Sequence, residues 1–293
     1  MMTFSPVGSF IDWIKLLRID RPVGYWLLLW PTLWGLLAAS GGRPSLKNVI
    51  IFVGGVVLMR SAGCVINDIA DRKFDPMVER TKARPIAAGK IAPGAALIGF
   101  VVMLLLALLL VAQTSAYVIV LAVIGAVLAS LYPFMKRYTH FPQAWLGMAF
   151  GWGAIMAWAA ETGDVFNSPI PWLLFFANVC WSLSYDTAYA LSDREDDKKI
   201  GVKSTAIFFG DAAVPAILIL GFMNIILLGV SAYILGGFWI GLAWWAAMIL
   251  QLMFGGRLMR CGEHWGFEFF ILSHYVGAIF TVGLVLQGFS TSL

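Results

Sequence analysis

Long apolar runs separated by short polar segments make up most of the chain after residue 22. Nine of these runs approach the roughly 20 residues that an α-helix needs to cross the hydrocarbon core of a bilayer. They cover residues 23–41, 46–66, 94–112, 115–133, 143–160, 170–191, 213–235, 237–255 and 267–288. The pattern therefore predicts an all-α integral membrane protein with nine transmembrane helices.

The segment before the first apolar run, residues 1–22, has a different pattern. Its FIDWIKLLRID stretch places apolar side chains on one helical face and charged side chains away from that face. An amphipathic helix of this kind is typical of segments that lie in the membrane interface. We therefore expect residues 1–22 to form an N-terminal interfacial segment.

The apolar runs are expected to form one transmembrane domain, residues 23–288, followed by a short C-terminal tail, residues 289–293. A repeated spacing of acidic residues, described below, suggests that this domain contains two related halves. The halves would cover about 23–133 and 143–255, with a final helix at 267–288.

Composition and charge placement agree with a membrane protein. The chain is 60% hydrophobic and 12% charged, about half the charged fraction of a typical soluble domain. Apart from Arg60, which is expected inside the second span, 17 of the other 19 Lys and Arg residues fall on one side of the predicted spans. Only Arg43 and Lys47 fall on the other side.

Lys and Arg are enriched in cytoplasmic loops, so this asymmetry predicts the orientation of the chain. We expect a protein of the bacterial inner (cytoplasmic) membrane, with a cytoplasmic N-terminus and a periplasmic C-terminus. The net charge of +4 reflects this topology. The sequence contains no basic soluble domain that would bind nucleic acid, and it indicates no obligate protein partner.

Two predicted cytoplasmic segments are rich in acidic residues. The first, GCVINDIADRKFD, follows the second span and contains Asn67, Asp68, Asp71 and Asp75. On a continuous helix, Asn67, Asp71 and Asp75 would share one face. Arg60 would lie on nearly the same face, deeper in the membrane.

The second acidic segment, YDTAYALSDREDDKKI, follows the sixth span. If the helix continues through it, Asp186, Asp193 and Asp197 share one face together with Tyr189. Asn67 and Asp193 are 126 residues apart, and so are Asp71 and Asp197. This repeated spacing is the basis for predicting two related halves.

Acidic residues at the ends of membrane helices are often simply solvated, and either segment alone would be explained in that way. Two acidic faces opposite one another would repel strongly at low dielectric unless cations lay between them. Carboxylate and amide oxygens favour hard cations such as Mg²⁺, which commonly keeps positions open for phosphate oxygens. The two segments together, with basic neighbours, favour a site for a metal-bound diphosphate.

The sequence resembles the UbiA superfamily of intramembrane prenyltransferases. NDIADRKFD fits the family pattern NDxxDxxxD, and DREDD fits the second pattern, DxxxD. Further stretches resemble the 4-hydroxybenzoate polyprenyltransferase branch: LLRIDRPVGYWLLLWPTLWGL, RTKARP, LYPFMKRYTHFPQAWLGMAFGWG and YDTAYALSDREDDKKIGVKSTAIFFG. The resemblance implies nine transmembrane helices around a central cavity.

The resemblance also implies an Mg²⁺-dependent transfer of a polyprenyl group from its diphosphate to the ring carbon ortho to the hydroxyl of 4-hydroxybenzoate, in ubiquinone biosynthesis. The expected ligands of the metal are Asn67, Asp68, Asp71, Asp75, Asp193 and Asp197. The acids expected to be catalytic are Asp71, Asp75, Asp193 and Asp197.

Basic and aromatic side chains complete the expected site. Candidates to bind the diphosphate are Arg60, Arg72, Lys136, Arg137 and Lys198. Tyr185 and Tyr189 are candidates to stabilise an allylic cation through their ring faces. Asp193 could accept the phenol proton, and Arg137 or Arg43 could bind the carboxylate of the acceptor. The long prenyl tail would need an opening to membrane lipid.

Three alternatives are compatible with parts of the pattern. A UbiA-type enzyme could use another acceptor, such as dihydroxynaphthoate or homogentisate. A secondary transporter would also contain intramembrane acids and related halves, but it would place them near the bilayer midplane. A membrane phosphotransferase acting on CDP-alcohols would carry a contiguous DGxxAR-type motif, which this sequence lacks.

Overall fold

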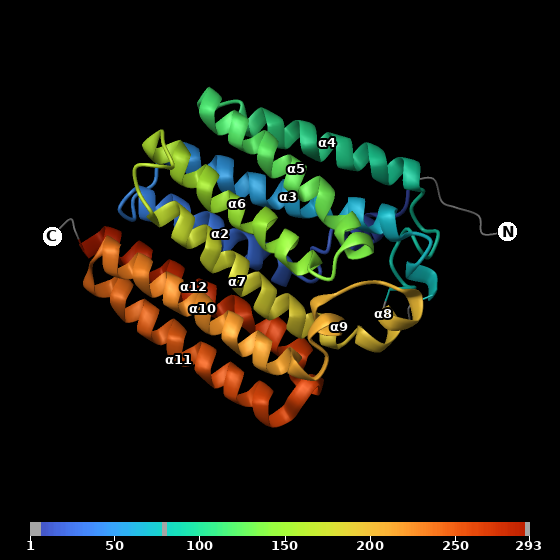
Figure 1. The fold of residues 1–293 in the computed structure, drawn as a ribbon. Coiled ribbons are helices and arrows are strands. Elements are labelled where there is room, and N and C mark those ends of the chain that lie inside the picture. The colour runs from blue at the N-terminus through green and yellow to red at the C-terminus, as the bar shows by residue number, and fades with distance from the viewer. Residues whose placement is uncertain (1–6, 78–80, 291–293) are drawn as a thin grey trace.

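The computed structural model describes residues 7–77 and 81–290, and its long helices pack into one bundle (Figure 1). Within these ranges the chain forms helices and no strand. The long helices are α2 (Val23–Ala39), α3 (Leu46–Asp71), α4 (Pro93–Val111), α5 (Ala116–Tyr138), α6 (Pro142–Thr162), α7 (Ile170–Leu191), α10 (Ala213–Leu235), α11 (Phe238–Cys261) and α12 (Gly266–Ser290). The short elements are α1 (Phe10–Leu16), η1 (Asp75–Met77), α8 (Arg194–Ile200), α9 (Thr205–Phe209), η2 (Gly210–Ala212) and η3 (Gly262–Trp265).

Each of the nine predicted spans coincides with one long helix of the described structure. By length and hydropathy, five helical segments of the described chain can cross a membrane, and one of them, Phe238–Ser290, contains both α11 and α12. Val23–Ala39 is a shorter apolar helix. The chain is therefore an all-helical integral membrane protein.

Polar side chains fix where several helices begin. The hydroxyl of Ser45 accepts a hydrogen bond from the Asn48 amide at 3.2 Å and caps α3. Ser115 caps α5 in the same way. Such caps satisfy amide groups that have no partner within the helix. α6 begins at Pro142, whose ring suits the first turn of a helix.

The helices pack as a closed arrangement in which α2 contacts α3, α6 and α12. α4 and α5 form one edge of the bundle, and α10 and α11 form the other (Figure 1). Aromatic residues pack between α2, α7 and α12: the ring of Trp34 lies 5.5 Å from that of Trp181 and 5.8 Å from that of Phe280. Gly277 allows α12 to approach the Trp30 and Trp181 rings closely.

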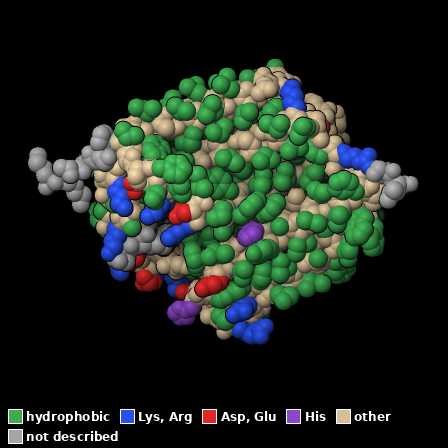
Figure 2. Space-filling view, turned by 180° about the vertical axis from the view of Figure 1, so that it is seen from behind, with side chains coloured by type: hydrophobic (Ala, Val, Ile, Leu, Met, Phe, Trp, Pro, Cys, Tyr) green, Lys and Arg blue, Asp and Glu red, His purple; other side chains and the backbone are tan. Residues whose placement is uncertain are grey.

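The outside of the bundle is largely apolar. Figure 2 shows hydrophobic side chains covering the broad face in view, whereas most of the charged side chains on this face gather toward its lower left. Exposed leucines and valines of α4 and α5 contribute to this surface, including Leu105, Leu109 and Val123. An apolar surface of this extent is unusual for a soluble monomer and suits contact with lipid.

α1 precedes the bundle and packs against it. A capping box between Ser9 and Asp12 begins the helix. Trp13, Leu16 and Leu17 belong to a small apolar cluster with α3 and α4, so part of the predicted amphipathic face contacts protein. Phe10 is 79% exposed. The interfacial position of residues 1–22 stays a prediction, and residues 1–6 lie outside the described structure.

Candidate active site

The first acidic segment lies where α3 ends. Asn67, Asp68 and Asp71 are on the last two turns of this helix, and Asp75 begins the short helix η1. The expectation that Asp75 shares a continuous helical face with Asn67 is therefore wrong. The chain turns after Asp71, and Pro76 lacks the amide hydrogen that a continuing helix would use.

Arg84 links Asp75 to Asp68, although Asp75 lies beyond the end of α3. Its Nη1 lies 3.1 Å from Oδ2 of Asp75 and 3.2 Å from Oδ1 of Asp68. The hydroxyl of Thr81 also donates to the Asp75 carbonyl at 2.9 Å. Sequence reasoning did not select Arg84, although RTKARP is one of the stretches that carried the family resemblance.

Asp68 is enclosed by two arginines. It is only 1% exposed. Nη2 of Arg18 donates to both of its carboxylate oxygens, at 2.8 and 3.2 Å, in addition to the contact with Arg84. Arg18 was also missed, because it lies 50 residues away in sequence. The metal-binding role expected for Asp68 stays a prediction, and in this structure both of its oxygens face arginine.

Asp71 combines an ion pair with an unused oxygen. Its Oδ2 accepts a hydrogen bond from Nζ of Lys136 on α5, a residue whose expected role in binding the diphosphate stays a prediction. Its Oδ1 is buried and has no hydrogen-bond partner among the described residues. Burying a carboxylate oxygen without a partner is costly, so this oxygen of Asp71 is suited to contact a bound cation.

Burial and neighbouring acids raise the pKa of Asp75. Desolvation is the largest cause, Arg84 opposes it, and the charges of Asp68 and Asp71 raise the pKa further. Crowded carboxylates of this kind gain stability from added positive charge. Added positive charge would therefore stabilise the carboxylates of the first acidic segment.

The second acidic segment does not continue α7. This helix ends at Leu191, and Asp193 occupies the N-cap position of α8. The expected face containing Asp186, Asp193 and Asp197 on one helix is therefore wrong. Asp193 and Asp197 are instead one turn apart on α8, since the Asp197 amide donates to the Asp193 carbonyl at 2.8 Å.

Arg194 fixes α8 to the end of the bundle. Its Nη1 donates to Glu263 on η3 at 2.8 Å and to the Gly210 carbonyl at 3.3 Å. Glu195 and Asp196 form pairs with Lys198 and Lys199 on the outer surface of α8. The segment is thus held by Arg194 from inside, while its outer face is solvated.

The basic residues expected to bind diphosphate divide into two groups. Lys136 contacts Asp71, and Arg137 lies nearby with Nη2 3.3 Å from the Ala70 carbonyl. Arg72 is exposed and donates to the Ile69 carbonyl at 2.8 Å, which is within its own helix. Lys198 is half exposed and pairs with Glu195 at 2.8 Å. These last two side chains therefore do not face the acids of the first segment in this structure.

Arg60 lies deeper in the bundle than expected for a ligand of the diphosphate. It precedes Asp71 by eleven residues on the same helix, about 16 Å along the axis. Its guanidinium packs closely on Gly24 and lies 5.9 Å from the Phe150 ring centre. Its Nε is buried and has no hydrogen-bond partner in the described part of the chain.

The two tyrosines form part of an aromatic wall. Tyr185 is buried, and its hydroxyl lies 2.8 Å from that of Ser182. The ring of Phe270 on α12 lies 5.9 Å from Tyr185 and 4.8 Å from Tyr189. The roles of Tyr185 and Tyr189 in stabilising a cation stay predictions.

Arg43 does not belong to this region. It lies between α2 and α3, at the opposite end of α3 from Asp71, and its Nε donates to the Gly288 carbonyl at 2.7 Å. Its suggested role in binding the acceptor carboxylate is therefore wrong, because α3 separates it from both acidic segments.

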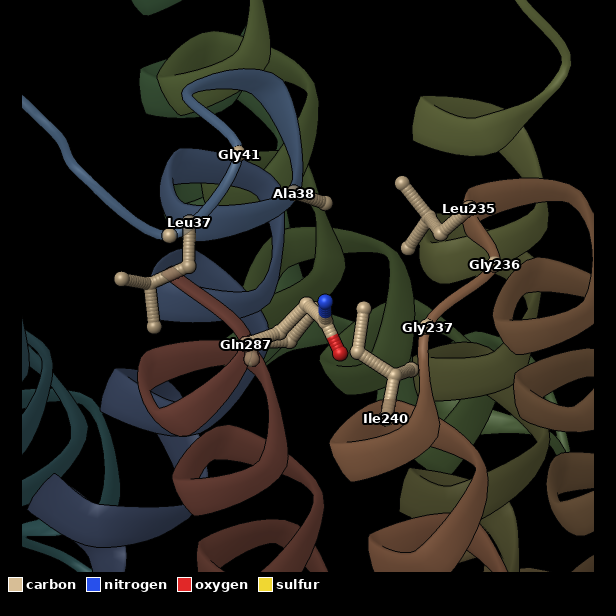
Figure 3. Close-up of a pocket in the computed structure, with 10 residues that line it drawn as sticks. Leu37, Ala38, Gly41, Leu235, Gly236, Gly237, Ile240 and Gln287 are labelled. Atoms are coloured by element: carbon tan, nitrogen blue, oxygen red, sulfur yellow. The ribbon is translucent and has the colours of Figure 1, made fainter. Parts of the chain in front are cut away.

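A cavity lies at the same end as Arg43. It has a volume of about 190 Å³ and is lined by residues of α2, α10, α11 and α12 and their turns. Figure 3 shows Gln287 projecting between Ala38 and Ile240, with Gly236 and Gly237 forming one rim. This cavity is remote from the acidic segments, and we assign no part of the candidate site to it.

The metal site can be tested against the donors that are present. Among the residues that the structure describes, no group of three or more His, Cys, Asp or Glu side chains is arranged to hold a metal ion. Arg18, Arg84 and Lys136 instead occupy the carboxylates of the first segment. The oxygen donor set and the partnerless Oδ1 of Asp71 nevertheless fit a hard cation.

The all-helical fold and the two acidic segments at one end define an integral membrane protein with a charged site where its helices end. The chain belongs to the UbiA prenyltransferase family, whose model matches residues 28–274. The 4-hydroxybenzoate octaprenyltransferase of Ectopseudomonas mendocina (strain ymp) is 49% identical over 94% of this chain and 93% of that protein. That of Pseudomonas aeruginosa (strain LESB58) is 58% identical over 69% of this chain and 67% of that protein.

Solved structures share the fold. The apo structure of a UbiA homologue from Aeropyrum pernix K1 has a TM-score of 0.77 and 24% identity, covering 88% of this chain and 97% of that one. A UbiA homologue from Archaeoglobus fulgidus bound to GPP and Mg²⁺ has a TM-score of 0.68 and 19% identity, covering 94% and 99%. At these identities the likeness shows the fold.

Proposed function

We propose that this protein transfers a polyprenyl group from polyprenyl diphosphate to the ring carbon ortho to the hydroxyl of 4-hydroxybenzoate, releasing pyrophosphate, in ubiquinone biosynthesis. The main support is identity of 49% across 94% of the chain with an enzyme named for prenylation of this acid. The buried acidic and basic cluster at the end of α3 supports the same reaction, because it suits a diphosphate with its cation.

We propose Mg²⁺ as the cofactor, with Asn67, Asp71 and Asp75 as its ligands in the first segment and Asp193 and Asp197 in the second. When bound, the metal would stabilise negative charge on the leaving diphosphate. The homologue from Archaeoglobus fulgidus, which was solved with GPP and Mg²⁺, supports this choice.

The basic residues that face the first segment would hold the diphosphate as the allylic carbon–oxygen bond breaks. Lys136 and Arg84 already lie against Asp71 and Asp75. When substrate phosphates enter, these two cations would find new partners among the phosphate oxygens, and the carboxylates would be released to bind metal. Charge-assisted hydrogen bonds of this kind are strong and well oriented.

The interior of the bundle would receive the rest of the substrates. Tyr185, Tyr189 and Phe270 offer ring faces to an allylic cation, each at roughly 0.5–2 kcal/mol. The apolar bundle would exclude water, which would otherwise capture that cation. After the new carbon–carbon bond forms, the ring loses its proton, and Asp193 stays a candidate to accept a proton from the acceptor.

We propose Arg60 as the residue that binds the acceptor carboxylate, in place of the diphosphate role expected from the sequence. Its buried Nε lacks a partner within the described structure, and it lies about 16 Å deeper than Asp71. A cation this deep in a membrane helix needs an anion. The carboxylate of a small aromatic acid would supply one.

We propose that the nine long helices all cross the membrane around a central cavity, with the acidic segments on the cytoplasmic side of the bacterial inner membrane. Residues 1–22 would lie in the interface, and the tail, 289–293, in the periplasm. The match between predicted spans and helices supports this topology. The related halves, about 23–133 and 143–255, remain part of the proposal.

The reaction can be tested with membranes that contain the protein, geranyl diphosphate, 4-hydroxybenzoate and Mg²⁺. Mass spectrometry is expected to detect the prenylated acid, and EDTA, Asp71→Ala and Asp193→Ala are each expected to abolish it. Pyrophosphate release without this product would keep the diphosphate site and indicate another acceptor, such as dihydroxynaphthoate or homogentisate. Folded protein that releases no pyrophosphate, even from longer prenyl diphosphates, would contradict the proposal.

A further inference from the structure

Arg18 has an unusual backbone conformation. Its φ is +63°, and it is the only residue other than glycine with positive φ in the described ranges. A side chain with a Cβ atom disfavours this region, so such a residue is kept only where its surroundings fix it. Arg18 follows α1 directly, where the chain turns toward α2.

The side chain of Arg18 is fixed at both ends of its guanidinium. Nη1 donates to the Lys15 carbonyl at 2.7 Å, which satisfies a carbonyl at the end of α1. Nη2 donates to both oxygens of Asp68, at 2.8 and 3.2 Å. Because of this left-handed backbone, the same guanidinium bonds to a carbonyl at the end of α1 and also reaches a buried carboxylate of α3.

α1 holds Arg18 at this place. Leu16 is fully buried and clusters with Val65 of α3 and with Ile86 and Ile91, which follow the first acidic segment. The hydroxyl of Tyr25 donates to the Leu17 carbonyl at 2.7 Å. The turn that carries Arg18 is thus anchored on the residues around Arg84.

The contacts continue from Arg18 to the candidate active site. Arg18 holds Asp68, Asp68 contacts Arg84, and Arg84 contacts Asp75. Asp68 is only 1% exposed, so it cannot replace Arg18 with solvent. Without Arg18, this buried acid would draw Arg84 toward itself and away from Asp75, because an unpaired buried charge is strongly unfavourable.

We propose that Arg18 is a positioning residue for the diphosphate site. Acting through Asp68, it sets the place of Arg84, so that Arg84 can bind phosphate while Asp75 faces the cation. Asp68 then organises two arginines and is not itself a metal ligand. This inference rests on the proposed function, and it extends the active site to a turn outside the transmembrane domain.

The test compares Arg18→Gln and Arg18→Lys with Lys15→Gln, which removes an exposed charge from the same helix. Isothermal titration would measure binding of geranyl thiolodiphosphate, an analogue that does not react, at several Mg²⁺ concentrations. Arg18→Gln is expected to weaken binding by roughly 10- to 100-fold, as loss of supporting contacts does in metal sites. Arg18→Lys should recover little, because lysine cannot contact both oxygens and the Lys15 carbonyl. Lys15→Gln should bind as the wild type does.

Two further measurements separate positioning from folding. Arg18→Gln should raise the KM for the prenyl diphosphate and leave that for 4-hydroxybenzoate within about twofold, with thermal unfolding of the purified protein monitored in parallel. Combining it with Arg84→Gln should give little additional loss, because both changes act on one contact chain. If the wild type binds the analogue and Arg18→Gln binds it equally well, the inference is overturned while the proposed function stands. Independent losses in the double variant would have the same meaning. Absence of binding by the wild type would instead contradict the proposed function.

Discussion

At the scale of single residues, Arg60 shows how burial changes the interpretation of a charge. Its position on the α3 wheel suggested the same ligand as Asp71. The structure places its guanidinium beside Gly24 and Phe150, in the aromatic interior. Its Nε is buried and has no hydrogen-bond partner among the described residues, which is why we propose that it binds an anion, and among the proposed substrates the acceptor carboxylate is small enough.

Arg60→Gln is therefore expected to raise the KM for 4-hydroxybenzoate by roughly 10- to 100-fold, the loss typical of a hydrogen bond to a charged group. The KM for the prenyl diphosphate should change much less. Inhibition by the neutral 4-hydroxybenzamide should also change little, since it presents no carboxylate. Steady-state kinetics with each substrate varied would measure this. A selective rise in the KM for the prenyl diphosphate would return Arg60 to the diphosphate, as the sequence first indicated.

Residue types and spacing selected the acidic residues and Lys136, which contacts Asp71, but not Arg18 and Arg84, the two arginines that face Asp68. Asp71 and Asp193 stand within recognisable patterns. Arg18 reaches Asp68 from a segment 50 residues earlier, and Arg84 reaches it from a turn that periodicity does not describe. Such partners depend on tertiary packing, so residue spacing offers no geometric reason to select them.

At the scale of elements, hydropathy located the long helices well because each needs a continuous apolar stretch. It did not locate where a helix ends when its last turns are polar. α3 ends at Asp71 before Asp75, and α7 ends at Leu191 before Asp193. Once a helix leaves the apolar core, local turns and side-chain contacts decide where it ends, and these leave little trace in a hydropathy pattern.

The link between α8 and η3 is one such contact. Arg194 bonds Glu263 and the Gly210 carbonyl, so it joins the second acidic segment to the loop between α11 and α12. Arg194→Ala and Glu263→Ala are each expected to lower kcat/KM for the prenyl diphosphate. The reversed pair, Arg194→Glu with Glu263→Arg, should recover part of the loss. The coupling free energy should fall between about 0.5 and 3 kcal/mol.

A double-mutant cycle on kcat/KM would measure that coupling. Lys199→Ala is the matched control, because it removes an exposed pair with Asp196 on the same helix, and such pairs contribute little. Additive effects of the two alanine substitutions, with no recovery in the reversed pair, would show that the Arg194–Glu263 contact does not position α8.

At the scale of the whole molecule, the placement of charged residues and the fold distinguish the same two ends of the bundle. The acidic segments lie at one end of the bundle, where most of the charged side chains in view also gather, and α12 ends at the other (Figures 1 and 2). An odd number of crossings would place the two termini on opposite sides of the membrane, in agreement with the 17 to 2 division of basic residues. The orientation stays a prediction that the sequence alone can make, whereas the pairing of distant segments needed the fold.

Cysteine labelling tests this orientation directly. The three cysteines are free: Cys261 is exposed at the end of α11, Cys64 is buried and Cys180 is half-buried within α7. A membrane-impermeant maleimide is expected to label Cys261 in inside-out vesicles and not in right-side-out ones. On a Cys261→Ser background, Asn167→Cys, in the exposed turn between α6 and α7, should show the opposite pattern. Labelling of Cys261 from the periplasmic side would invert the topology and place both acidic segments outside the cytoplasm, where a prenyl diphosphate made in the cytoplasm could not reach them.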